Sequence, residues 1–285
     1  MRVLGVRRTA ALLVLALGLA ACNAADEGTR APAPADADGG DGGVVSDGGV
    51  NPGGAESPPG VPSPPDTGQP GPNDLGPLGA MCRPMLRAKS LTVEIDWQAG
   101  AKPEASAVDH LVSVLRSVVA GDVTLAGGTE IPGQGDTWTT AALQGLAAAH
   151  RSQYSHDDAA ALYVLSVRGN FHEEAALGVA HRASEVALFP DRMGGLTALL
   201  GGRAALERAV LVHEAGHLLC LVNIGFSSAH DREDAEHPHH SSDRSSVMHW
   251  AIDTSAVSTL FNGPPPADFT AQDRDDLARL RTGQA

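Results

Sequence analysis

The chain has 285 residues and a formal net charge of −14, with 34 acidic against 20 basic side chains. This acidic balance argues against a nucleic-acid partner and against docking on anionic lipid, because both partners repel negative charge. The roughly 205 residues from Ala80 onward are enough for one domain with a sizeable hydrophobic core.

Residues 1–22 have the composition of a secretory signal. Arg2, Arg7 and Arg8 precede an apolar run that is shorter than the roughly 20 residues needed to span a bilayer. The run ends in Leu-Ala-Ala-Cys22, which resembles the bacterial lipobox, and the resemblance implies that Cys22 is lipidated. We expect the mature protein to be exported and held at the bacterial cell envelope by this lipid anchor alone. An ordinary signal peptide with an incidental Cys22 is the alternative.

Residues 23–79 are rich in Gly, Pro, Asp, Ala and Ser, and no helical or strand period runs through them. Such a segment cannot bury enough apolar surface to offset its chain entropy, so we predict a disordered tether. The tether either extends the reach of the domain from the membrane or is a spacer whose sequence is unimportant.

The remaining residues, 80–285, alternate predicted strands and helices. Apolar runs and alternation predict strands at residues 90–97, 122–125, 160–168, 171–181 and 184–189. Helical periodicity predicts helices at residues 103–120, 137–151, 204–221 and 270–281. We expect a single α/β (α+β) domain in which a mixed twisted sheet is packed by helices, with residues 171–181 at a sheet edge.

The predicted helix at residues 204–221 contains His213-Glu214-Ala-Gly-His217, an H-E-x-x-H motif. Residues four apart share a helix face, so His213 and His217 can bind one metal ion. Glu214 can then act as general base on a water at that ion. The helix is strongly apolar, and unpaired His and Glu would be costly to bury there. The motif therefore predicts a metal site, with zinc as the ion, in preference to two unrelated surface histidines.

A catalytic zinc normally takes three protein ligands, so one more is required. Glu233 and Glu236 would suit a gluzincin arrangement, but they lie in a polar loop. The same loop is rich in histidine, and His240, His237 and His230 are the candidates for the third metal ligand. A solvated loop that scavenges metal non-specifically is the competing interpretation.

Residues 204–250 resemble the metzincin family of zinc peptidases. Residues 213–223 follow the frame H-E-x-x-H-x-x-G-x-x-H, but Cys220 replaces the turn glycine and Asn223 replaces the third histidine. A glycine there permits a left-handed turn, which costs another residue about 1 kcal/mol, and a neutral amide is a poor zinc ligand. We therefore interpret Asn223 as a residue that holds the frame of the loop.

The downstream segment is similar to two further metzincin patterns. Archaemetzincins carry His-Cys-x4-Cys-x-Met, and this chain has His240-Ser241-x4-Ser246-Val-Met248, with serine at both cysteine positions. The segment that ends at Trp250 resembles the Met-turn of astacin-like metzincins, in which a tyrosine stands where this chain has Trp250.

The resemblance implies a zincin/metzincin-like fold with an active-site helix. It implies that His213, His217 and His240 hold Zn²⁺ above a Met-turn at Met248, with Glu214 as the catalytic base. The implied function is a zinc-dependent endopeptidase at the cell surface. Its substrate would be a peptide or protein that pairs with the edge strand at residues 171–181, and we expect a monomer.

The alternative function is a non-catalytic zinc-binding surface lipoprotein, either a degenerate peptidase or a metal scavenger. The departures from the family patterns at Cys220, Asn223, Ser241 and Ser246 keep this alternative open, whereas the presence of Glu214 argues against it.

Two cysteines remain once Cys22 is assigned to lipid. Cys82 and Cys220 could pair, although sequence alone does not define the geometry that a disulfide needs. A free cysteine is often a small buried apolar residue, and we favour that interpretation for Cys220.

Overall fold

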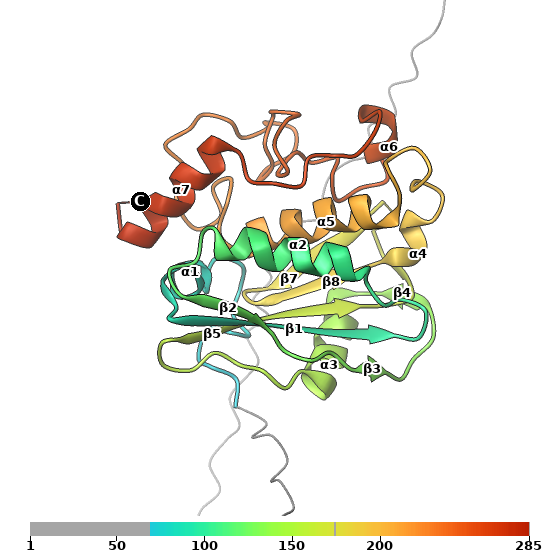
Figure 1. Cartoon of the computed structure of the whole chain (residues 1–285), viewed down its shortest axis with the longest axis horizontal. Helices are drawn as coiled ribbons and strands as arrows, with labels where there is room; N and C mark the ends of the chain where they lie inside the picture. The colour runs from blue at the N-terminus through green and yellow to red at the C-terminus, as the bar shows by residue number, and fades with distance from the viewer. Residues whose placement is uncertain (1–68, 174, 285) are drawn as a thin grey trace, which may run out of the picture.

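The computed structural model describes residues 69–173 and 175–284 (Figure 1). The predicted signal peptide, Cys22 and most of the predicted tether lie outside the described residues. The strands are β1 (Ser90–Gln98), β2 (Asp122–Leu125), β3 (Glu130–Ile131), β4 (Asp136–Trp138), β5 (Ala159–Ser166), β6 (Gly169–Phe171), β7 (Gly178–Arg182) and β8 (Glu185–Leu188). The helices are α1 (Cys82–Arg87), α2 (Ala105–Arg116), α3 (Thr140–His150), α4 (Pro190–Met193), α5 (Arg203–Leu218), α6 (Val257–Leu260) and α7 (Ala271–Thr282).

The main sheet has six strands. Five of them lie in the order β2-β1-β5-β8-β7, and the sixth, β3, pairs with the C-terminal end of β1. All the neighbouring pairs are parallel except β7 with β8, which is antiparallel. Helices α2 and α5 lie on one face of the sheet and α3 lies on the other (Figure 1). The prediction of a mixed sheet packed by helices is confirmed.

The central strand β5 shows why its sequence reads as a continuous apolar run. Leu162 and Val164 belong to the hydrophobic core on the α5 side of the sheet. Tyr163 and Leu165 belong to the core on the α3 side. Strands buried on both faces carry apolar residues at every position, which is the pattern expected for the middle of a parallel sheet.

The prediction of one strand over residues 171–181 is wrong. The segment divides into the end of β6, which pairs with β4 in a separate two-stranded sheet, and β7, the last strand of the main sheet. The intervening residues turn and pair with a distant segment, because the backbone N–H of Leu177 donates to the Asp253 carbonyl and that of Ser255 donates to the Ala175 carbonyl. The predicted sheet edge is nevertheless confirmed for β7.

The C-terminal end of the predicted tether packs against the domain. Asp74 is fully buried, and its carboxylate accepts hydrogen bonds from the backbone N–H and the hydroxyl of Ser155, each at 2.7 Å. The Arg151 guanidinium lies 3.6 Å from the same carboxylate. Asp74, which lies within the predicted tether, therefore anchors the chain to the domain.

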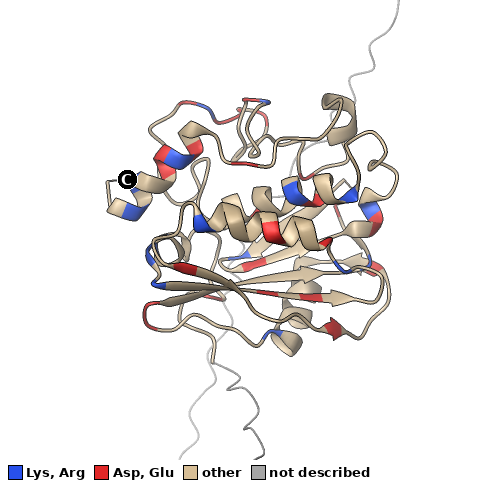
Figure 2. Cartoon of the chain, viewed as in Figure 1, with Lys and Arg blue, Asp and Glu red and all other residues tan. Residues whose placement is uncertain are grey.

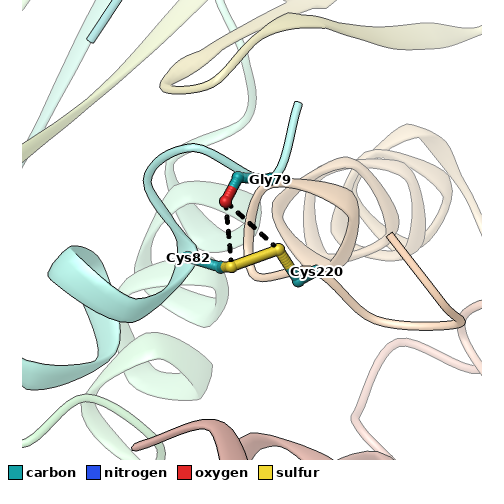
Figure 3. The surroundings of a disulfide bond; sticks show 3 residues. All are labelled: Gly79, Cys82 and Cys220. Atoms are coloured by element: carbon teal, nitrogen blue, oxygen red, sulfur yellow. Dashed lines mark hydrogen bonds between the residues drawn. A yellow bond between two sulfur atoms is a disulfide. The ribbon is translucent and has the colours of Figure 1, made fainter. Parts of the chain in front are cut away.

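Cys82 and Cys220 form a disulfide that joins α1 to the turn after α5 (Figure 3). Their Cα atoms are 5.6 Å apart, within the range that disulfides require. The Gly79 carbonyl oxygen lies 3.2 Å from Sγ of Cys82 and 3.6 Å from Sγ of Cys220 (Figure 3). The prediction that Cys220 is a free buried cysteine is wrong, because the start of the domain folds back onto the end of α5.

Candidate metal centre

Helix α5 carries the H-E-x-x-H motif through the interior of the domain. Its residues from Leu206 to Leu218 are buried except Arg208, because α2, the strands β7 and β8 and α4 all contact it. A helix covered on every side needs apolar residues all round, which explains why His213, Glu214 and His217 stand in a strongly apolar sequence. Their polar atoms must find partners inside the protein.

After α5 the chain turns through three residues in the left-handed backbone conformation, and none of the three is glycine. Cys220, Val222 and Asn223 have φ angles of 69°, 56° and 66°. Such conformations cost non-glycine residues about 1 kcal/mol or more each and persist only where the surroundings enforce them. Here Cys220 is tied by its disulfide and Val222 is fully buried. The turn expected of glycine at position 220 is therefore made by a cross-linked cysteine.

Asn223 anchors the loop that follows. Its side-chain amide donates to the Glu233 carboxylate at 2.5 Å, and its carbonyl oxygen accepts from the Ser228 backbone N–H at 2.7 Å. The other oxygen of Glu233 accepts from the backbone N–H of His239 at 2.7 Å. Asn223 thus fixes the residue immediately before His240, which agrees with its expected role in holding the frame.

A buried ion cluster secures the same loop to α7. The Arg232 guanidinium pairs with the carboxylates of Asp273 and Asp276, and all three side chains are at most 5 % exposed. The Ser228 hydroxyl donates to Asp276 at 2.7 Å. Acidic and basic residues alternate along α7 (Figure 2), and the acids near its N-terminus are favourably placed with respect to the helix dipole. The loop is therefore anchored both at Asn223 and at α7, and Ser228 bonds to both anchors.

The structure brings His213, His217 and His240 together. One ring nitrogen from each lies within 4.8 Å of the others, and the Nε2 atoms of His213 and His217 are 3.0 Å apart. Zinc–imidazole bonds of about 2.0–2.1 Å at tetrahedral angles would separate the ligand atoms by about 3.3 Å. The three rings are therefore spaced as the ligands of a single small ion.

Hydrogen bonds set the tautomers of two of these rings. Nδ1 of His213 lies 2.7 Å from the Val247 carbonyl oxygen, and Nδ1 of His240 lies 3.0 Å from that of Pro238. A carbonyl can only accept, so both Nδ1 atoms carry the proton and both Nε2 atoms offer a lone pair. Metal-binding histidines commonly have this arrangement, in which the outer hydrogen bond orients the ring. The Nε2 atom of His240 has no hydrogen-bond partner among the described residues.

Burial keeps the three imidazoles neutral. It lowers the pKa of His213 to about 3, with a smaller contribution from His240. It lowers the pKa of His240 to about 4 and that of His217 well below its ordinary value. Neutral imidazoles are the form that binds metal ions. The donor set therefore fits zinc, a borderline-soft ion that takes nitrogen ligands.

Met248 lies directly against α5 at Gly216. Its side chain is fully buried, and its Sδ atom occupies the space where a β-carbon on Gly216 would stand. The preceding carbonyl, that of Val247, is the one that orients His213. The Ser246 hydroxyl accepts from the Met248 backbone N–H at 3.0 Å and shapes the turn. Met248 therefore packs its turn against α5, next to the carbonyl that orients His213.

Glu214 lies on the side of α5 that faces β7. Gly178 permits this approach, because a β-carbon there would stand 2.6 Å from Val210 Cγ1 and 3.0 Å from the Glu214 Oε1 atom. Burial and the neighbouring Asp253 raise the pKa of Glu214 well above its ordinary value, and a hydrogen bond from the Ala180 backbone opposes them. Within the described part of the chain, Oε1 has no hydrogen-bond partner. This oxygen is free to take a proton.

Asp253 is the one site residue that the sequence reasoning missed. Its Oδ2 atom lies 3.9 Å from Nε2 of His213 and 3.9 Å from Nε2 of His240. It also groups with His213 and Glu214 as a possible set of metal ligands. Burial raises the pKa of Asp253 to about 7. Nothing in its sequence context, Ala-Ile-Asp-Thr, resembles a ligand motif.

The other candidate residues lie elsewhere. The ring of His237 stacks on Trp250 with a centroid separation of 4.2 Å, and neither belongs to the histidine group. His230 lies 3.0 Å from the Asp275 carboxylate of α7. Glu233 is bonded to Asn223. Of the loop histidines considered as third ligand, the structure brings His240 alone to the pair on α5.

The centre is nearly closed to solvent. Exposed fractions are 0 % for His213, 1 % for Glu214, 2 % for His217, 3 % for Asp253 and 7 % for His240. The turn before β7 and the segment around Asp253 pair by backbone hydrogen bonds beside the site. This pairing therefore contributes to the cover over the centre.

Solved structures of two archaemetzincins are among those similar to this chain. The archaemetzincin of Methanopyrus kandleri has 18 % sequence identity, covers 69 % of this chain and 98 % of its own, and gives a TM-score of 0.41. The archaemetzincin of Archaeoglobus fulgidus, solved with malonate, has 15 % identity, covers 65 % of this chain and 99 % of its own, and gives a TM-score of 0.37. No protein-family model matches the sequence, and no curated protein is similar to it in sequence.

Proposed function

We propose that the protein is a zinc-dependent endopeptidase. The observation that carries the proposal is the convergence of His213, His217 and His240, with Glu214 next to the first of them in the helix. Three neutral imidazoles are a donor set typical of a catalytic zinc site, and the carboxylate of Glu214 beside them can act as the general base. A purely structural zinc site has no use for an unpartnered buried carboxylate at its side.

The chemistry follows from the positions of these side chains. A zinc ion held by the three imidazoles would supply the Lewis acidity that makes a water nucleophilic near neutral pH. Glu214 accepts the proton of that water and later delivers it to the nitrogen of the leaving amine. In this role the carboxyl group of Glu214 holds the proton between the two steps.

The substrate class follows from the sheet edge beside α5. Strand β7 is the last strand of the main sheet and contacts α5. We propose that an extended peptide adds to this edge as a further antiparallel or parallel strand, because main-chain pairing is a general way of holding peptides next to a site. The substrate is accordingly a peptide or an unfolded segment of a protein.

We also propose that the protein is located at the cell envelope. The signal-like N-terminus and the lipobox-like Leu-Ala-Ala-Cys22 support export and lipid anchoring at the cell envelope. Among the described residues, no helix combines the length and the apolar composition needed to cross a membrane.

The test compares zinc content and peptide cleavage in the full-length chain and its Glu214→Gln variant. We expect both proteins to bind one zinc ion, and we expect the variant to cleave a mixed peptide library at least about 10²-fold more slowly. Glu236→Gln, an exposed carboxylate of the His240 loop, serves as the matched control and should cleave at the wild-type rate. Wild-type cleavage by Glu214→Gln would remove the peptidase assignment.

One observation favours the second candidate, a non-catalytic zinc-binding lipoprotein. The nearly complete burial of the centre is more typical of a structural site than of an open cleft. The same experiment separates the two functions, because a non-catalytic protein would bind one zinc ion tightly and cleave no member of the library.

A further inference from the structure

Asp253 enters the metal centre from a segment that the H-E-x-x-H motif does not include. It follows the Met248 turn, and its carboxylate is 3 % exposed. Its Oδ2 atom is equally distant, 3.9 Å, from Nε2 of His213 and Nε2 of His240. No other carboxylate among the described residues lies within 4 Å of both nitrogens.

The atoms that face one another here are acceptors. Because the Val247 and Pro238 carbonyls hold the protons of His213 and His240 on Nδ1, the Nε2 atoms of both rings carry lone pairs. Nε2 of His213 lies 3.0 Å from Nε2 of His217, whereas Nε2 of His240 has no hydrogen-bond partner among the described residues. The separation of 3.9 Å is too long for a hydrogen bond. The second oxygen, Oδ1, has no hydrogen-bond partner in the part of the chain that the structure describes. Buried acceptors without donors are costly, and a shared cation removes that cost.

The backbone fixes Asp253 at this place. Its carbonyl accepts from the Leu177 N–H at 2.6 Å, and two residues later the Ser255 N–H donates to Ala175 at 2.9 Å. The isolated antiparallel bridge between Ala176 and Thr254 lies between these two bonds. This short pairing leads directly into β7, so Asp253 is held by the same chain that covers the site.

We propose that Asp253 is a fourth protein ligand of the ion held by His213, His217 and His240. Ligand atoms around a tetrahedral zinc ion are about 3.3 Å apart, and Oδ2 lies 3.9 Å from two of the three nitrogens. Asp253 groups with His213 and Glu214 and not with His217, so its side chain must move toward His217 to complete the tetrahedron. The carboxylate contributes a negative charge that three neutral imidazoles lack.

A fourth protein ligand would control whether water can reach the ion, and this inference rests on the proposed zinc centre. A catalytic zinc keeps one position for water, and in the resting protein Asp253 fills that position. Turnover then requires Asp253 to leave, which requires the pairing of residues 175–177 with residues 253–255 to open. The resting protein is closed at the metal as well as at the surface.

The experiment uses the full-length chain with Co²⁺ in place of zinc, because the visible spectrum of Co²⁺ reports its ligands. Azide is the probe, since it binds only where a ligand position is exchangeable. The variants are Asp253→Ala and the nearly isosteric Asp253→Asn, whose folding is checked by circular dichroism. Glu173→Gln is the control, because this nearby carboxylate lies outside the group of possible ligands.

We expect azide to leave the wild-type and Glu173→Gln spectra unchanged and to shift the spectra of both Asp253 variants. We also expect zinc affinity, measured against a competing chelator, to fall at least tenfold in both Asp253 variants, since even outer-shell partners of metal ligands contribute 10–100-fold. An equal azide response in wild type and variants, or unchanged zinc affinity, would overturn the proposal. Neither readout depends on peptide cleavage, so the peptidase assignment stands or fails separately.

Discussion

Met248 fills the space that a side chain at Gly216 would need, and this contact seats the Met248 turn against the helix that carries His213 and His217. Gly216 stands between Glu214 and His217 in the motif. A β-carbon there would force the buried methionine away and with it the Val247 carbonyl that orients His213.

Replacement of Gly216 by Ala should therefore destabilise the protein, although alanine is the better helix former. We expect a loss of about 1–3 kcal/mol from overpacking, measured by urea unfolding. Gly145→Ala in α3 is the matched control, because no described atom lies within 4 Å of the added carbon. That variant should gain about 0.5–1 kcal/mol. A gain in both variants would show that Met248 does not confine position 216.

Removal of the Asn223 side chain should weaken zinc binding without touching a ligand. Asn223→Gly keeps the left-handed backbone (φ 66°) while it removes the hydrogen bonds to Glu233 and Ser228. We expect zinc affinity to fall about 10–100-fold, as for other outer-shell partners, in a chelator competition assay. Glu236→Gln, on the exposed side of the same loop, should bind zinc like wild type. Equal affinity of Asn223→Gly and wild type would mean that α7 alone positions His240.

Reduction of the Cys82–Cys220 disulfide should destabilise the domain. The bond closes a loop with a sequence separation of 138 residues and holds Cys220 in its left-handed conformation. We expect a loss of about 2–5 kcal/mol, measured as the difference between urea unfolding with and without reductant. Cys82→Ser should be as unstable as the reduced protein and should not respond to reductant. A response of that variant would indicate an effect unrelated to this bond.

His181 should make stability fall in mild acid. Burial, with Arg182 and Arg151 nearby, lowers the pKa of His181 to about 3 in the folded protein. Between that value and an unfolded pKa of about 6.5, only the unfolded chain binds the proton, so stability decreases as pH falls below about 6.5. From pH 7.5 to 5.5 this one group should remove about 1.4 kcal/mol.

The measurement compares urea unfolding of wild type and His181→Asn at these two pH values, with chelator present so that metal binding does not contribute. The variant should lose about 1.4 kcal/mol less than wild type over the interval. Parallel losses in the two proteins would show that His181 takes up its proton in the folded state.

Local spacing made part of this structure predictable. The helix α5 and its two histidines follow from periodicity and from residues four apart, and β1, β2, β5 and β8 follow from apolar runs within a residue or two of the predicted bounds. The expectation that His240 is the third ligand follows from the resemblance to the archaemetzincin pattern, in which the histidine stands at a fixed distance before the methionine.

Long-range pairing was not predictable. The burial of Asp74 depends on Ser155, 81 residues away, and the division of the predicted strand at residues 171–181 depends on its pairing with Asp253 and Ser255. Asp253 itself has no motif, because its place in the centre is set by that pairing and not by its neighbours in sequence. The disulfide of Cys220 likewise depends on a distant residue, because Cys82 lies 138 residues away in the sequence.

The most direct test of the account is an anomalous X-ray difference map at the zinc absorption edge, from crystals of the chain grown with equimolar zinc. We predict one strong peak about 2.0–2.1 Å from the Nε2 atoms of His213, His217 and His240. A zinc ion bound by other histidines of the loop, or no peak between these three nitrogens, would contradict the metal centre on which the proposed peptidase function depends.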